Sequence, residues 1–112
     1  MTLVEDYKPI KGPAAAIFNP KRFSIMSVLY LRGALPMKTL RDATGLTWGD
    51  LDSNLRYLER RGLVALRRVL TSKGPRTYVV LTDEGARAYE ELVSYLRSTL
   101  ARRPPETREA EA

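Results

Sequence analysis

Residues 46–62 hold the side chains best suited to binding chemistry, and they fall at the spacing of a single helix. Asp50, Ser53 and Asn54 are short hydrogen-bonding groups, and arginines follow them near the end of the stretch. Because leucines take one narrow face of this helix, the polar groups occupy the others. The pattern favours a helix whose exposed face meets something polar and anionic. Taken alone, the stretch fits an ordinary solvated surface helix equally well.

The composition excludes most catalytic chemistry. The 112 residues include no cysteine and no histidine, which removes disulfides, thiolate metal sites, cysteine nucleophiles and imidazole acid–base catalysis. The sequence shows no paired carboxylates, Gly-rich phosphate loop or nucleophile elbow. We therefore expect a binding protein that is not an enzyme and that needs neither a metal nor another cofactor.

Local signals mark both ends of the predicted helix. Thr47 is a good N-cap, since its hydroxyl accepts from the free amides of the first turn. Asp50 suits the positive end of the helix dipole and can reach back to the cap. Gly62 follows the last periodic residue, where a left-handed conformation commonly ends a helix. The apolar stripe comprises Leu51, Leu55 and Leu58.

Positive charge is concentrated in the middle of the chain. The net charge is +6, yet residues 20–82 hold twelve basic and four acidic side chains and so carry +8. This local excess favours a polyanionic partner, whereas solubility alone would not require the asymmetry. The length and the 44% hydrophobic content fit one globular domain. Because no apolar run reaches membrane-spanning length and no signal peptide is seen, we expect a cytoplasmic location.

An arm and a central helix are predicted first along the chain. Residues 1–18 are expected to form an extended or partly ordered arm whose apolar end docks on the core or on a second subunit. Asn19 and Pro20 then start a helix, which is apolar around much of its girth and ends at Gly33. Residues 34–37 fit an extended link or a very short strand.

A helix-turn-helix is predicted next. A short helix spans about residues 37–44, with Leu40 and Ala43 facing inward, and a turn containing Gly45 joins it to the helix that Thr47 caps. Two helices joined by such a turn form the arrangement in which the second helix enters the DNA major groove.

The last third of the chain predicts a hairpin and a long helix. Residues 63–71 and 76–82 are rich in β-branched and apolar residues, and residues 72–75 between them signal a turn. The final helix runs to about residue 103, with an apolar seam at three- and four-residue spacing. Its distal half extends beyond any core that a domain of this size offers, so a partner helix is its natural cover. The tail that follows is expected to be flexible.

The order of these elements, together with several of their sequences, resembles the winged-helix transcriptional regulators of the MarR/ArsR-like group. The resemblance implies an α+β, mostly helical fold: a winged helix-turn-helix with a two-stranded wing and a long C-terminal dimerisation helix. It also implies a homodimer that binds specific double-stranded DNA as a transcriptional repressor or activator, of which we favour a repressor. Residues 19–29 look like the group's first helix, 39–47 like its second helix and turn, 51–64 like its recognition helix, and 77–85 like its wing exit.

Two departures from the group lie in the recognition helix. Asp52 stands where relatives often carry serine, and Asn54 stands where many carry histidine. The carboxylate of Asp52 adds negative charge to a helix that is expected to approach DNA. The ArsR-type metal sensors use Cys and His ligands, which this chain lacks, so metal sensing of that kind is excluded.

Site residues follow from these expectations. Base readout is expected from Gly49, Asp50, Ser53 and Asn54, since Asn pairs with adenine, Asp accepts from cytosine, and Gly allows close approach. The DNA backbone would meet Lys38, Arg41, Thr47, Arg56 and Arg60, and the wing would add Lys73 and Arg76. The dimer seam would comprise Tyr89, Leu92, Val93, Leu96 and Leu100.

Plainer alternatives stay open for several of these residues. Asp50 is equally suited to helix capping alone, Arg60 to solvation, and Trp48 to packing against the first helix or the wing. A protein-interaction module that has lost DNA binding is the alternative function. The predicted division of the chain is an arm (1–18), a DNA-binding domain (19–82), a dimerisation helix (83–103) and a tail (104–112). The operator and any small-molecule effector are not specified by the sequence.

Overall fold

The computed structural model describes residues 7–104 and shows that the apolar end of the arm is helical. Helix α1 (Gly12–Ala16) has Pro13 in its first turn, and Ala14 and Ile17 are fully buried. The prediction that this end of the arm docks on the core is thus confirmed. Residues 1–6 of the arm and 105–112 of the predicted flexible tail lie outside the described residues.

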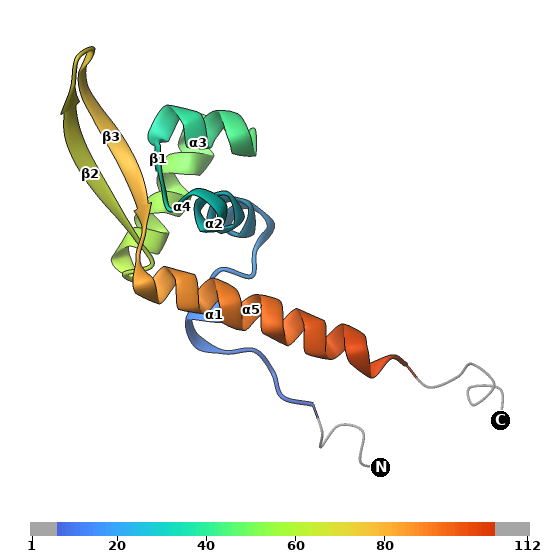
Figure 1. Cartoon of the computed structure of the whole chain (residues 1–112). Coiled ribbons are helices and arrows are strands. Elements are labelled where there is room, and N and C mark those ends of the chain that lie inside the picture. Colours follow the sequence, from blue (N-terminus) through green and yellow to red (C-terminus); the bar gives the residue numbers. More distant parts are fainter. Residues whose placement is uncertain (1–6, 105–112) are drawn as a thin grey trace, which may run out of the picture.

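Helix α2 (Pro20–Arg32) lies centrally, as its sequence predicts. The side chain of Asn19 caps it by accepting from the backbone amides of Lys21 and Arg22. The buried residues of this helix are Ile25, Met26 and Leu29. In Figure 1 this helix lies between the paired helices that follow it and the long C-terminal helix.

Helices α3 (Met37–Thr44) and α4 (Trp48–Arg60) form the predicted helix-turn-helix. Gly45 ends α3 in the left-handed conformation, with φ 72°, which glycine adopts without steric cost. Leu40 is buried but Ala43 is exposed, so the prediction that Ala43 faces inward is wrong. Thr44, four positions after Leu40, lies on the inner side of the helix instead. Its hydroxyl donates to the Leu40 carbonyl.

The sheet has three strands in the order β1-β3-β2, all antiparallel. Strand β1 (Ala34–Pro36) pairs with β3 (Gly74–Leu81), which also pairs with β2 (Val64–Thr71). The hairpin turn is shorter than predicted, because Gly74 and Pro75 already pair with the end of β2. Gly74 permits this tight turn through its φ of 99°. The β2–β3 wing projects well beyond the helices (Figure 1).

Helix α5 (Asp83–Arg102) leaves the sheet and extends away from the wing, with the arm running beside it (Figure 1). Thr82 caps it by accepting from the amide of Gly85. Its buried positions end at Leu92, so its last turns project from the core. The core comprises Ala14, Ile17, Ile25, Met26, Leu29, Leu40, Leu51, Leu55, Leu58, Leu63, Val64, Val79, Ala88 and Leu92.

Candidate nucleic-acid interface

The leucine stripe of helix α4 packs fully into the core. The opposite side of the helix therefore forms one exposed ridge. The hydroxyl of Thr47 caps the helix by accepting from the amide of Asp50 at 3.1 Å, and Gly62 follows its end with φ 74°. Both caps were predicted from the sequence and both are confirmed. Opposite the buried Leu51, Leu55 and Leu58, the exposed residues of the ridge are Gly49, Asp52, Ser53 and Arg56.

Asp50 and Asn54, both predicted base readers, lie on the flank of α4 that contacts α2. The Asp50 carboxylate accepts from Nζ of Lys21 at 2.8 Å. This bond is the main reason that the pKa of Asp50 is lowered from its ordinary value. The Asn54 side-chain oxygen accepts from Arg22 at 3.1 Å, and its amide donates to the Asp50 carbonyl at 2.8 Å. Both side chains therefore already have partners within the chain.

Arg22 is a residue of the interface region to which sequence reasoning gave no role. Its Nε donates to the carbonyl of Ala16 at 2.7 Å, at the end of α1. Its guanidinium lies 4.0 Å from the ring centroid of Tyr57, while that of Arg61 lies 3.5 Å from the same ring. The arginine thus joins α1 and α2 to the recognition helix. No local spacing signals this role, since its partners lie up to 35 positions away.

Asp52 and Arg56 form an ion pair on the exposed ridge. The Nε of Arg56 donates to Oδ2 of Asp52 at 2.9 Å, and the two side chains are 66% and 56% exposed. The bond to Asp52 raises the pKa of Arg56 above its ordinary value. The negative charge of Asp52 is thereby compensated within the same helix.

A cleft of about 570 Å³ separates the start of α3 and α4 from the wing. Its lining includes Lys38, Trp48, Lys73 and Arg76, together with several hydroxyl side chains. Trp48 is 48% exposed, and the guanidinium carbon of Arg41 lies 4.9 Å from its ring centroid. The cleft combines positive charge with hydroxyl donors, which suits a sugar–phosphate strand.

The remaining basic residues assigned to DNA differ in their surroundings. Lys38 pairs with Asp42 at 3.3 Å, and Arg60 is exposed in the last turn of α4. The Nε of Arg41 is buried and lacks a hydrogen-bond partner among the described residues. Lys73 and Arg76 are exposed on either side of the wing turn. The structure brings Lys73 and Arg76 to the same cleft as Lys38.

The predicted dimer seam on α5 is corrected at Leu92. Leu92 is fully buried in the core of its own chain, so it has no surface to offer a partner. Tyr89 stacks on Phe23 and Tyr30, with ring centroids 5.6 and 4.7 Å away. Tyr89 thus lies on the face of α5 that packs on α2. Among the other predicted seam residues, Tyr89, Val93 and Leu96 are half-buried and Leu100 is exposed.

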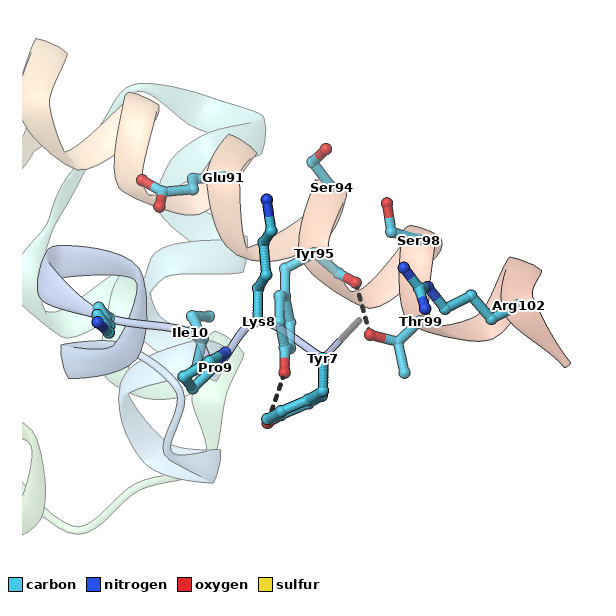
Figure 2. A pocket seen from close by; sticks show the side chains of 11 residues that line it. Tyr7, Lys8, Pro9, Ile10, Glu91, Ser94, Tyr95, Ser98, Thr99 and Arg102 are labelled. Carbon is cyan, nitrogen blue, oxygen red and sulfur yellow. Dashed lines mark hydrogen bonds between the residues drawn. The ribbon is translucent and has the colours of Figure 1, made fainter. Parts of the chain in front are cut away.

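The arm and the distal part of α5 enclose a hollow of about 710 Å³ (Figure 2). The hydroxyl of Tyr95 hydrogen-bonds that of Tyr7 at 3.0 Å. This bond raises the pKa of Tyr95. Lys8, Arg102 and the hydroxyls of Ser94, Ser98 and Thr99 also line the hollow.

Residues 7–104 hold no group of three or more potential ligands that could bind a metal ion. None of the helices described is long and apolar enough to cross a membrane.

Comparison with known families and structures agrees with this geometry. A family model described as a winged helix DNA-binding domain matches residues 21–100. The solved structure of a transcriptional regulator homologue from Pyrococcus horikoshii OT3 is 36% identical over 78% of this chain and 86% of that chain, with a TM-score of 0.73. Comparison with curated proteins gave no match.

Two further solved structures are more distant. A MarR-family transcriptional regulator from Silicibacter pomeroyi is 26% identical, with a TM-score of 0.60, over 86% of this chain and 66% of that chain. NadR, solved with 4-hydroxyphenylacetate, is also 26% identical, with a TM-score of 0.64 and coverage of 78% of this chain. This chain spans only 61% of the length of NadR.

Proposed function

The chain belongs to the winged helix DNA-binding domain family, and on that premise we propose that it is a sequence-specific transcriptional repressor that binds double-stranded DNA as a homodimer. The observation that supports this proposal is the exposed ridge of α4, which lies beside the basic cleft. The ridge enters the major groove, and one DNA strand follows the cleft toward the wing. Arg76 on the wing then reaches the neighbouring minor groove, where narrow A·T-rich DNA attracts arginine.

Phosphate contacts position the protein on its site. Wing residues Lys73 and Arg76 face the same cleft as Lys38, so one strand can be held from both sides. The hydroxyl of Thr47 and the amides at the start of α4 add donors at the positive end of a helix dipole. The proposed backbone contacts on the helices are Lys38, Arg41, Thr47, Arg56 and Arg60.

Base readout belongs to the first two turns of α4. Ser53 is exposed there, and Gly49 lets the backbone approach the DNA closely. Asp50 and Asn54 contribute to readout if DNA displaces their contacts with Lys21 and Arg22. Each reader that makes a correct bidentate contact adds about 1–3 kcal/mol of discrimination.

The test is selection of bound sequences from a random duplex pool, followed by affinity measurements over a range of salt. Each phosphate neutralised by the protein lowers the slope of log K against log salt by about 0.9. Changing Lys73 to Ala should therefore make the slope shallower by about one, with little change in base preference. Arg97, which is exposed on α5 away from the cleft, provides the matched control. Equal affinity of the wild type for selected and random duplexes would reject sequence-specific regulation.

A protein-interaction module without specific DNA binding is the alternative function. Two carboxylates at the groove-facing end of α4 favour it, but each is paired with a cation in the structure. If the alternative holds, replacing both Arg56 and Arg76 with Ala should leave regulation unaltered. Loss of regulation together with DNA binding would exclude it.

A small-molecule effector is a further part of the proposal. The hollow between the arm and α5 combines tyrosine rings with three cationic side chains and the one carboxylate of Glu91, a net positive lining that suits a small aromatic anion. The cationic residues are Lys8, Lys11 and Arg102. NadR was solved with 4-hydroxyphenylacetate, so this compound is a suitable probe. Binding should raise the melting temperature of the wild type and not that of an Arg102→Ala variant. An equal shift in both proteins would place the compound elsewhere.

A further inference from the structure

We propose that Arg56 reads a guanine in the major groove and that Asp52 is the positioning residue that holds the arginine for this contact. The inference rests on the proposed function and revises the assignment of Arg56 to a phosphate. It also gives a role to Asp52, whose negative charge is otherwise unfavourable beside DNA.

The placement of the two side chains supports readout. Gly49, Ser53 and Arg56 follow one another at spacings of four and three residues, so they share one face of α4. This face is exposed and lies opposite the buried leucines. Arg56 therefore points in the same direction as the small residues that allow close approach to the bases.

The hydrogen bond within the pair leaves the reading edge of Arg56 available. Asp52 accepts from Nε at 2.9 Å, which occupies one edge of the planar guanidinium. The Nη1–Nη2 edge stays available to donate two parallel bonds, which match O6 and N7 of guanine. Holding Nε also restricts a flexible side chain, so less conformational entropy is lost when the base is bound.

The charge of the pair argues against a phosphate anchor. Asp52 offsets the positive charge of Arg56 on the ridge, which weakens long-range attraction to the DNA backbone. Arg60, one turn later, is exposed and is better placed to supply that attraction. A carboxylate beside an arginine thus reduces binding to random DNA while it preserves a directional contact with one base.

The experiment compares base preferences of the full-length wild type with those of Asp52→Ala, Asp52→Asn, Arg56→Ala and Arg56→Lys. Affinities are measured for the selected duplex and for its variants at each position. The wild type should prefer guanine at one position per half-site by roughly 5- to 150-fold, the range expected of a bidentate contact. Arg56→Ala should lose this preference, and Arg56→Lys should lower it, since lysine reaches O6 and N7 as a point charge without the planar fork.

Asp52→Ala should lower the guanine preference severalfold and raise the affinity for random duplex, whereas Asp52→Asn should retain part of the preference. A purely structural role would not produce these opposite changes. Asp42→Ala is the matched control, because Asp42 forms a similar exposed pair with Lys38 on α3. It should leave every base preference unchanged.

The outcomes separate this inference from the proposed function. A wild type that binds all duplexes equally would reject the proposed function, and the inference with it. A wild type that is sequence-specific, with a guanine preference unchanged in Arg56→Ala, would overturn the inference alone. A preference for a G·C pair that is lost in Asp52→Ala but kept in Arg56→Ala would also overturn it, because Asp52 would then read the cytosine of that pair directly. Thermal unfolding of each variant near that of the wild type confirms that the fold is intact.

Discussion

At the scale of single residues, Arg22 connects the interface to the rest of the chain. It contacts the end of α1 through Ala16 and the recognition helix through Asn54 and Tyr57. The same arginine therefore fixes a predicted base reader and the docked arm.

Replacing Arg22 with Ala should lower the free energy of unfolding by about 2 kcal/mol, because two hydrogen bonds from a charged donor and a cation–π contact are lost. Urea denaturation measures the change. Arg32→Ala, an exposed substitution at the end of the same helix, should stay within about 0.5 kcal/mol of the wild type. Equal effects of the two changes would mean that the Arg22 contacts contribute nothing to stability.

Gly49 and Gly85 are both helical glycines, yet they should respond oppositely to alanine. A Cβ at Gly49 meets nothing within 4 Å, so Gly49→Ala should stabilise the fold by about 0.5–1 kcal/mol. A Cβ at Gly85 would overlap the backbone oxygen of Leu63, so Gly85→Ala should cost at least about 2 kcal/mol. Thermal denaturation compares them.

DNA binding by Gly49→Ala tests the proposed close approach of the backbone. The variant should be more stable than the wild type and yet bind the selected duplex more weakly. Unchanged affinity would show that the start of α4 does not closely approach the DNA.

At the scale of elements, the sequence predicts best what is decided locally. The caps by Asn19, Thr47 and Gly62 depend on neighbours within a few residues, and all three are confirmed. The partners of Asp50 and Asn54 lie on α2, about 30 positions away, and they depend on how the helices pack. Which face of α5 points inward also depends on how the helices pack. The sequence alone does not identify this face, because apolar residues lie on more than one face of the helix.

The junction of α2 and α5 should weaken at high pH. Tyr30 donates a hydrogen bond to the carboxylate of Glu90, which raises the pKa of Tyr30 above its ordinary value of 10.0. The folded state thus holds the phenol proton more tightly than the unfolded state. The stabilisation is present below about pH 10 and is lost as pH rises through the folded pKa.

Tyr30→Phe should therefore be less stable than the wild type at pH 7, and the difference should shrink as pH rises above 10. Urea midpoints between pH 7 and 11 provide the comparison. Glu90→Gln keeps an acceptor but removes the charge, so its pH dependence should also be flatter than that of the wild type. A difference that stays constant with pH would contradict the linkage.

At the scale of the whole molecule, the two ends of α5 have different surroundings. The first half packs on α2 and the core through Ala88 and Leu92. The last turns project away from the wing (Figure 1), and Leu100 is 80% exposed. With Val93 and Leu96 it forms a stripe at spacings of three and four residues, the pattern that a second helix covers.

We predict that this stripe makes a homodimer, since one ridge and one wing bury too little surface for tight specific binding, whereas two half-sites suffice. Leu100→Asp should raise the dimer dissociation constant at least 100-fold, because two buried leucines are lost, each worth about 1.5–3 kcal/mol. Sedimentation equilibrium measures it. Leu70→Asp is the matched control: this leucine is 83% exposed but lies on the wing, so the dimer should persist. A wild type that is monomeric at micromolar concentration would reject the dimer and require a single-site mode of DNA binding.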